Sequence, residues 1–409
     1  MRQTGDETGS GRRVAQRVKD IKPFYVMDVL EKAQAMERAG QDVVHLEVGE
    51  PDFDAPEPVK EAVAKAIRDG HTHYTHSLGL AELREAICEH YLERYGVTLH
   101  PDQVVVTNGT SPAMLMLFAA LLEPGDQVIL SDPHYACYPS FIRFADGEPV
   151  LVRVQEEDGF QYRVEAVEAA LTPRTRAVLV NSPGNPTGTL LPAERMAGLV
   201  NLTDITNLAN GGVPIVSDEI YHGLVYGEPG QSPAEAGEHS VLEFTDEAFV
   251  LNGFSKLYAM TGLRLGYLIA PRGWTEALRK LSQNFFISAN AVSQWAGVAA
   301  LRECAQDVAR MRAVYDQRRR AMLAGLRAMG LSVVVEPTGA FYVFVNISRY
   351  STDAYAFAFE ILEQTRVGVT PGTDFGPGGE GHIRFSYANS LENIERGLAR
   401  IAEYLARRG

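Results

Sequence analysis

The sequence predicts an α/β protein in which helices sandwich a mainly parallel seven-stranded sheet, with a smaller α+β domain attached. One observation behind this prediction is the regular alternation of short apolar runs with helical stretches between residues 104 and 217. Such alternation is typical of a parallel sheet covered on both faces. The other is a long helical stretch over about 290–329, after which a shorter set of strands and helices follows. We therefore expect two domains.

The elements of the first domain follow from apolar periodicity and from helix-breaking residues. Before the alternation, the sequence predicts a strand over 43–48 and helices over 27–39, 57–69 and 80–95. The alternation predicts strands over 104–107, 127–131, 149–154, 177–181 and 213–217, and helices over 112–122, 138–145, 164–171 and 192–210. The apolar runs 248–252 and 265–270 complete the seven strands.

The second domain is predicted from a shorter pattern. Strands are expected over 332–335, 341–345 and 382–386, and helices over 353–365 and 391–407. We expect three regions: a tail and arm at 1–50 that joins the small domain, a large domain at 51–290, and a small domain at 291–409. Residues 1–19 are polar and lack an apolar core, so they indicate a loose tail and not a secretory signal.

Composition limits the partners. The net charge of −14 argues against nucleic acid and anionic membranes as bulk partners. No apolar run reaches the roughly 18 residues that a membrane span needs. Cys88, Cys137 and Cys304 are far apart and fit no metal or disulfide spacing. We expect a cytoplasmic protein without a metal.

Lys256 is the central candidate for chemistry. It lies in a turn between the apolar runs 248–252 and 265–270. A lysine held between two buried strands is poorly solvated, so its ammonium form is disfavoured and its amine becomes a nucleophile. Such an amine suits Schiff-base chemistry, for which pyridoxal 5′-phosphate is the commonest cofactor. The alternative is one of many solvated lysines on a connecting loop.

Polar residues follow several other predicted strands, and parallel sheets bind ligands at the carboxyl ends of their strands. Gly109, Thr110 and Ser111 join a strand to a helix, where free backbone N–H groups can bind phosphate. A plain helix start is the alternative. Tyr135, which follows the next strand, can stack on a pyridine ring or pack in the core.

Three further positions suit the same cofactor. The turn 181–188 contains two prolines and two glycines, and its rigidity can present the Asn185 amide to a phenolate oxygen. Asp218 ends a buried strand and needs a cationic partner such as a protonated pyridine nitrogen, unless it caps a helix. Tyr221 can donate to the same phenolate oxygen. Arg264 carries a guanidinium fork suited to phosphate.

Together these motifs resemble the class I/II aminotransferases, which are fold-type-I, aspartate-aminotransferase-like pyridoxal phosphate enzymes. The resemblance extends from residue 21 to the last predicted helix. It is carried by Asn-Pro-Thr-Gly (185–188), Ser-Asp-Glu-Ile-Tyr (217–221) and Ser-Lys-x-x-x-Met-Thr-Gly-x-Arg (255–264). It implies a ping-pong transfer of an amino group between an L-amino acid and a 2-oxo acid.

The resemblance also implies roles. Lys256 would bond covalently to the cofactor and shuttle the proton, Asp218 would pair with the ring nitrogen, and Asn185 and Tyr221 would contact the ring oxygen. The phosphate would be held by Gly109, Thr110, Ser111, Ser255 and Arg264. The substrate carboxylate would be bound by Arg384, Asn185 and the backbone of Gly49. Tyr74 resembles the tyrosine that reaches the phosphate of the neighbouring subunit, which implies a homodimer with shared active sites.

Two positions depart from the family pattern. Gly253 stands where many relatives carry a hydroxyl, so the resemblance implies one phosphate contact fewer at this position. Ser111 stands where some aspartate-specific relatives carry a lysine for the second carboxylate. Substrate choice is expected to lie with residues near the arm and loops, which are mostly apolar: Phe24, Tyr25, Phe286 and Phe341. We therefore expect a neutral or aromatic amino donor, with 2-oxoglutarate or pyruvate as acceptor.

Two other functions fit the same apparatus. A β-lyase acting on a sulfur amino acid would release pyruvate and ammonia with the same lysine and arginine. A non-enzymatic regulator would need an added DNA-binding module, for which the roughly 20 residues before the arm and the negative charge give little support.

Overall fold

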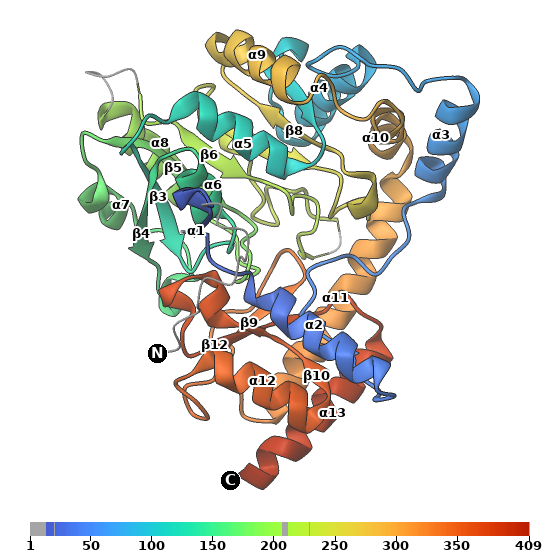
Figure 1. The fold of residues 1–409 in the computed structure, drawn as a ribbon, viewed down its shortest axis with the longest axis vertical. Helices are drawn as coiled ribbons and strands as arrows, with labels where there is room; N and C mark the ends of the chain where they lie inside the picture. The colour runs from blue at the N-terminus through green and yellow to red at the C-terminus, as the bar shows by residue number, and fades with distance from the viewer. Residues whose placement is uncertain (1–13, 20, 207–211, 229, 409) are drawn as a thin grey trace.

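The structure is a computed structural model that describes residues 14–19, 21–206, 212–228 and 230–408. A seven-stranded sheet with its helices forms the larger part, and two small sheets with three helices form the smaller part beside it (Figure 1). Residues 1–13 of the predicted tail and residues 207–210 of the predicted helix 192–210 lie outside the described residues. The division of the chain at residues 50 and 290 stays a prediction.

The large sheet is mainly parallel, as predicted. Its order is β2-β8-β7-β6-β5-β3-β4, and β8 alone runs antiparallel to its neighbours β2 and β7. The strands are β2 (Val104–Thr107), β3 (Gln127–Asp132), β4 (Glu148–Arg153), β5 (Thr175–Asn181), β6 (Ile215–Asp218), β7 (Phe249–Gly253) and β8 (Gly266–Ile269).

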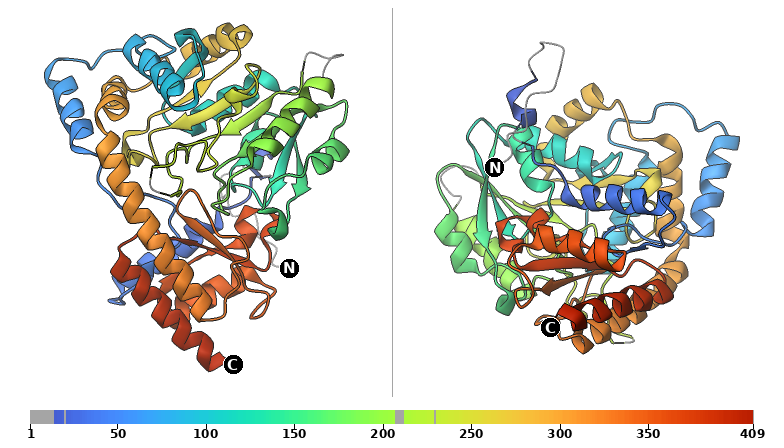
Figure 2. Two further views of the ribbon diagram at one scale, coloured as in Figure 1. Left: turned by 180° about the vertical axis from the view of Figure 1, so that it is seen from behind. Right: turned by 60° about the horizontal axis from the view of Figure 1, so that its bottom comes forward.

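Both faces of this sheet are buried except along the edge strand β4, which explains the unbroken apolar runs of the inner strands. Along β5, Val178 and Val180 pack into one hydrophobic cluster, while Ala177 and Leu179 pack into a second cluster on the opposite face. Helices cover the two faces (Figure 2). They are α4 (Ala81–Tyr95), α5 (Thr110–Leu121), α6 (Tyr138–Phe144), α7 (Val164–Ala170), α8 (Ala193–Thr206), α9 (Thr275–Phe285) and α10 (Ala291–Glu303), and α3 (Glu57–Arg68) packs on α10.

Three helical segments differ from the prediction. Helix α9 was not predicted. The helical stretch 290–329 consists of two helices separated by the buried Cys304. Helix α10 ends before this residue, and α11 (Ala305–Ala328) begins after it and extends to the small part. A short helix, α1 (Gln16–Lys19), lies within the segment predicted as a loose tail.

The small part contains a three-stranded antiparallel sheet of order β11-β12-β9. Its strands are β9 (Tyr342–Asn346), β11 (Thr370–Pro371) and β12 (His382–Ser386), and its helices are α2 (Tyr25–Arg38), α12 (Ala354–Thr365) and α13 (Leu391–Arg408). The predicted strand 43–48 is reduced to β1 (Val44–His45), which pairs with β10 (Val367–Gly368). Through this pair the N-terminal arm joins the small part.

The predicted strand 332–335 is wrong. Only an isolated bridge between Ser332 and Asn346 forms there, so the segment has no continuous ladder of hydrogen bonds. Val334 is 61% exposed, so its side chain is not part of a buried face. Strands β10 and β11 were not predicted, because each is only two residues long. No helix among the described residues is both long and apolar enough to cross a membrane.

Candidate active site

A cavity of about 250 Å³ lies where the carboxyl ends of β5 and β6 face the small part. Its walls come from segments far apart in the chain, including the arm, the start of α5, the turns after β5 and β7, and strand β12. Many of the predicted site residues line it: Phe24, Gly49, Thr110, Ser111, Tyr135, Asn185, Asp218, Tyr221, Lys256 and Arg384.

Lys256 faces this cavity with a partly deprotonated amine. Its Nζ donates to the carbonyl oxygen of Gly49 at 2.6 Å. Burial of the ammonium group lowers the pKa of Lys256 to about 8, with the positive charges of Arg384 and Arg264 acting in the same direction and Glu50 opposing them. The amine therefore exists in both forms near neutral pH, as a nucleophile and proton carrier requires.

Asp218 is 4% exposed at the end of β6. Its Oδ2 accepts a hydrogen bond from the Tyr138 hydroxyl at 2.6 Å, and its Oδ1 accepts one from the backbone N–H of Ile220 at 3.2 Å. Burial raises the pKa of Asp218 to about 6, and these two bonds oppose that rise. The sequence missed Tyr138, because nothing in the segment 132–139 distinguishes it from Tyr135.

Glycines allow three segments to meet beside α5. A Cβ on Gly109 would lie 2.6 Å from Nη2 of Arg264, and a Cβ on Gly266 would lie 2.7 Å from the carbonyl carbon of Gly109. Helix α5 has no side-chain cap at its start, and Thr110 and Ser111, whose backbone N–H groups have no helical partners, line the cavity. This arrangement suits an anionic group.

The departure at Gly253 has a packing reason. Gly253 pairs with Gly266 between β7 and β8, and a Cβ on Gly253 would lie 3.0 Å from the Gly266 Cα. A hydroxyl-bearing side chain does not fit there without movement of the backbone. Ser255 and Arg264 lie next to this glycine pair, outside the cavity lining, and Arg264 is exposed.

Arg384 is 3% exposed on β12. Its Nη1 donates to Oδ1 of Asn185 at 2.8 Å, and its Nη2 donates to the Glu47 carbonyl at 2.6 Å and to Oγ1 of Thr370 at 3.2 Å. The guanidinium lies 4.3 Å from the ring centroid of Tyr342. Its Nε is buried without a hydrogen-bond partner among the described residues. A fork held this firmly suits a carboxylate.

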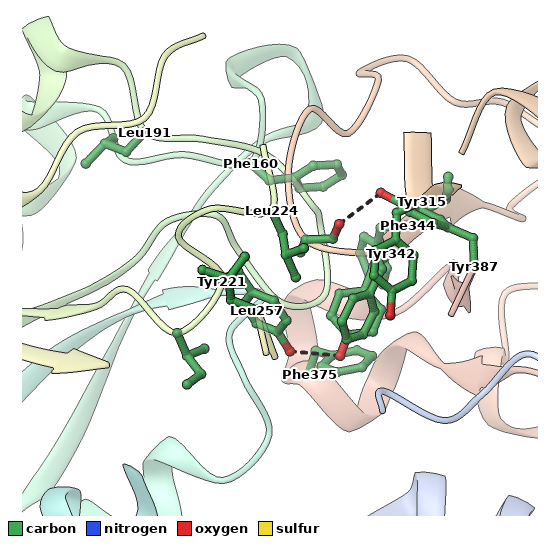
Figure 3. Close-up of a cluster of buried hydrophobic side chains, with 14 of the residues drawn as sticks. Phe160, Leu191, Tyr221, Leu224, Leu257, Tyr315, Tyr342, Phe344, Phe375 and Tyr387 are labelled. Carbon is green, nitrogen blue, oxygen red and sulfur yellow. Dashed lines mark hydrogen bonds between the residues drawn. The ribbon is translucent and has the colours of Figure 1, made fainter. Parts of the chain in front are cut away.

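Tyr221 and Tyr342 share a hydrogen bond of 2.8 Å between their hydroxyls (Figure 3). Tyr342 lines the cavity and was missed by the sequence, which selected its neighbour Phe341. Phe341 is fully buried and packs against Tyr221 and Tyr315 instead of lining the cavity.

Four other predicted residues lie outside the lining, and one of them is Gly109, the residue before α5. Tyr25 packs against Tyr355, with ring centroids 5.2 Å apart. Phe286 packs on the second hydrophobic cluster of the large part. Tyr74 is 80% exposed on the surface. The structure therefore brings most of the predicted cofactor residues together and leaves part of the predicted substrate set outside.

The sequence profile of the family described as aminotransferase class I and II matches residues 41–401. The chain belongs to this family. Aminotransferases of this family use pyridoxal phosphate, and this one is a pyridoxal-phosphate-dependent aminotransferase.

Two curated relatives are each 40% identical to this aminotransferase. One is the (5-formylfuran-3-yl)methyl phosphate transaminase of Methanocaldococcus jannaschii, aligned over 96% of this chain and 99% of the relative. The other is the aspartate/prephenate aminotransferase of Thermus thermophilus, aligned over 97% and 100%. The solved Thermus thermophilus aspartate aminotransferase with maleate has a TM-score of 0.89 and 40% identity, covering 96% of this chain and 99% of that one.

The residues present fit pyridoxal 5′-phosphate. The cavity holds a lysine amine whose pKa is lowered to about 8 and a buried carboxylate at the end of β6. The close approach of Gly109 and Gly266, which a Cβ on Gly266 would block, lies beside the uncapped start of α5, whose free backbone N–H groups suit a phosphate. The aminotransferase therefore offers a covalent anchor, a partner for a ring nitrogen and a phosphate cradle in one place.

Proposed function

We propose that this aminotransferase takes a neutral or aromatic L-amino acid as donor and a 2-oxo acid, such as 2-oxoglutarate or pyruvate, as acceptor. The supporting observation is the charge of the cavity wall. Among the described residues that line it, Arg384 and Lys256 are the only cations, and Ser111 is neutral. One guanidinium suits one α-carboxylate, which leaves a second carboxylate without a partner.

The arm supports the same donor class. Phe24 and the α2 residues Val26, Met27 and Leu30 line the cavity together with Met114 of α5. These side chains form an apolar wall that favours an apolar donor side chain. Tyr25, Phe286 and Phe341 do not contribute to this wall, so substrate choice is assigned to the arm and to Tyr342.

Pyridoxal 5′-phosphate, when bound, supplies an electron sink that makes the α-proton of the amino acid acidic. Lys256 Nζ takes this proton and returns it. Asp218 would pair with the ring nitrogen, and Asn185 and Tyr221 would contact the ring oxygen. Tyr135 would stack on the ring. The phosphate would be held by Gly109, Thr110, Ser111, Ser255 and Arg264.

Substrate orientation is assigned to Arg384. Its guanidinium and the backbone of Gly49 bind the α-carboxylate, with Asn185 as a further contact. Lys256 Nζ already lies 2.6 Å from the Gly49 carbonyl oxygen. A carboxylate bound at Gly49 therefore brings the α-carbon close to the amine, and this positioning carries much of the rate.

We assign a homodimeric assembly with shared active sites, in the cytoplasm. Tyr74 is exposed in the single chain, and so are Phe285 and Ile287, at 67% and 49%. The segments that carry them are tied together by the bond from the Thr75 N–H to Ser288 Oγ at 3.3 Å. A second copy would cover this patch and bring Tyr74 to the partner's phosphate. The three unpaired cysteines support a reducing compartment.

The test is the absorption spectrum of the yellow holoprotein before and after addition of single amino acids, without an acceptor. We expect stoichiometric conversion to pyridoxamine 5′-phosphate with release of the matching 2-oxo acid, faster for phenylalanine, leucine or valine than for aspartate. Lys256→Ala should abolish the conversion, and Lys280→Ala, at an exposed lysine of α9, should not. Faster conversion with aspartate would overturn the donor class. Sustained release of ammonia and pyruvate would indicate a β-lyase.

A further inference from the structure

Tyr138 is a buried tyrosine whose hydroxyl points at the carboxylate end of the cavity. It is the first residue of α6 and is 1% exposed. Its hydroxyl donates to Asp218 Oδ2 at 2.6 Å. The ring of Tyr135 packs edge-on against it, with centroids 5.2 Å apart and an interplanar angle of 80°. Burial raises the pKa of Tyr138 well above its usual value, so the hydroxyl keeps its proton and acts as the donor.

The charged and titratable groups around Asp218 come from several segments. Glu219 follows it in the chain and raises its pKa, whereas His222, three residues further on, lowers it. Lys256, after β7, interacts with Asp218 through charge, as do the hydroxyls of Tyr135 and Tyr138. In the described part of the chain, Tyr138 is the only side chain that donates a hydrogen bond to the Asp218 carboxylate.

We propose that Tyr138 is a positioning residue of this aminotransferase: its hydroxyl keeps Asp218 ionised and correctly oriented to pair with the protonated ring nitrogen of pyridoxal 5′-phosphate. The inference rests on the proposed role of Asp218. A carboxylate buried this deeply tends to take up a proton, and a neutral Asp218 would not favour a charged ring nitrogen. The tyrosine bond opposes protonation because it stabilises the carboxylate form.

The experiment measures the dissociation constant of pyridoxamine 5′-phosphate at a series of pH values, because this form binds without a bond to Lys256. In the wild-type protein, affinity should fall as Asp218 takes up its proton. In Tyr138→Phe the midpoint of this fall should move up by about one pH unit, the shift expected when a buried carboxylate loses one hydrogen bond. The loss of affinity should then be largest just below neutral pH and small in alkali.

Tyr162→Phe is the matched control. Tyr162 is 2% exposed, and its hydroxyl donates to the Leu179 carbonyl at 2.9 Å, so the variant also loses one buried hydrogen bond. Its midpoint should equal that of the wild type. A second test places Tyr138→Phe in an Asp218→Asn background, where it should cause no further change in affinity.

The outcomes separate this inference from the proposed function. An unchanged midpoint in Tyr138→Phe, in a protein that still binds the cofactor and transaminates, overturns the inference alone. The inference is also overturned if Tyr138→Phe lowers the cofactor affinity of the Asp218→Asn variant as much as it lowers that of the wild type. Tyr138 would then act without Asp218. A wild-type protein that does not bind the cofactor overturns both.

Discussion

Nη1 of Arg384 lies 2.8 Å from Oδ1 of Asn185. This bond joins β12 of the small part to the turn that follows β5 of the large sheet. The same guanidinium is held by the Glu47 carbonyl and by Thr370. The residue assigned to the substrate carboxylate and a residue assigned to the cofactor therefore form one hydrogen-bonded unit across the two parts of the molecule.

Replacement of Arg384 by lysine should weaken the binding of amino acids. Lysine cannot reproduce a fork that donates in several directions. We expect the KM for the amino donor to rise by roughly 10-fold or more, the equivalent of one lost hydrogen bond to a charged group. The measurement is the donor dependence of the half-reaction. Arg310→Lys on the surface of α11 should leave this KM unchanged. An unchanged KM in Arg384→Lys would remove Arg384 from the carboxylate site.

Lys256 should react with amine reagents at lower pH than other lysines. Its pKa is lowered to about 8 by burial, so the neutral amine accumulates as pH rises through 8. An ordinary lysine reaches this state only near pH ~10.4. The check is reductive methylation of the cofactor-free protein across this range, quantified peptide by peptide. Lys280 provides the internal comparison. Equal pH profiles for the two lysines would contradict the prediction.

Gly266→Ala should lower the affinity for pyridoxal 5′-phosphate. The added Cβ would lie 2.7 Å from the carbonyl carbon of Gly109 and 2.9 Å from the backbone nitrogen of Thr110, so the phosphate cradle must move. A misplacement of this kind costs roughly 10-fold or more in affinity, about 1.4 kcal/mol. Equilibrium dialysis measures it. Gly262→Ala is the control in the same segment, because its Cβ would meet nothing within 4 Å. The prediction fails if both variants bind equally well.

Arg318→Ala should lower the melting temperature. Arg318 of α11 is 7% exposed and binds both carboxylate oxygens of Asp52, at 2.7 and 2.8 Å. The Asp52 side chain is 28% exposed, so the pair is only partly buried, and the loss of these hydrogen bonds to a charged group should cost about 1.5 kcal/mol. Arg302 also binds both oxygens of Glu89, but that pair is exposed, at 46% and 54%, and Arg302→Ala should cost below about 1 kcal/mol. Calorimetry of the two variants compares them. Equal shifts would mean that burial does not decide the effect.

Much of the architecture could be predicted from local pattern. The inner strands of the large sheet are buried on both faces, so they appear as unbroken apolar runs that can be recognised without knowing their neighbours. Strands β10 and β11 left no such signal, because two residues are too few to form a pattern. Segment 332–335 carried an apolar pattern, but only Ser332 pairs with a strand, at Asn346 of β9, so no ladder forms.

Some residues of the candidate site could be predicted from the sequence, and others could not. Lys256, Asp218 and Asn185 stand in motifs with fixed spacing, and the structure brings all three to one cavity. Tyr138 and Tyr342 matter through contacts to residues 80 and 121 positions away, which spacing does not encode. The choice of Phe341 over Tyr342 failed to match the cavity lining because Phe341 lies just before β9 and packs against Tyr221 and Tyr315, whereas Tyr342 reaches the cavity.

The sequence by itself determined the family, the cofactor and the parallel sheet, because these depend on residue types at fixed spacing and on apolar runs along the chain. Only the tertiary structure decided which groups bind Asp218 and Arg384, which side chains line the cavity, and which glycines allow the start of α5 to approach β8. These features arise from contacts between segments hundreds of residues apart, such as Glu47 with Arg384. Their distances and burial exist only after the chain has folded.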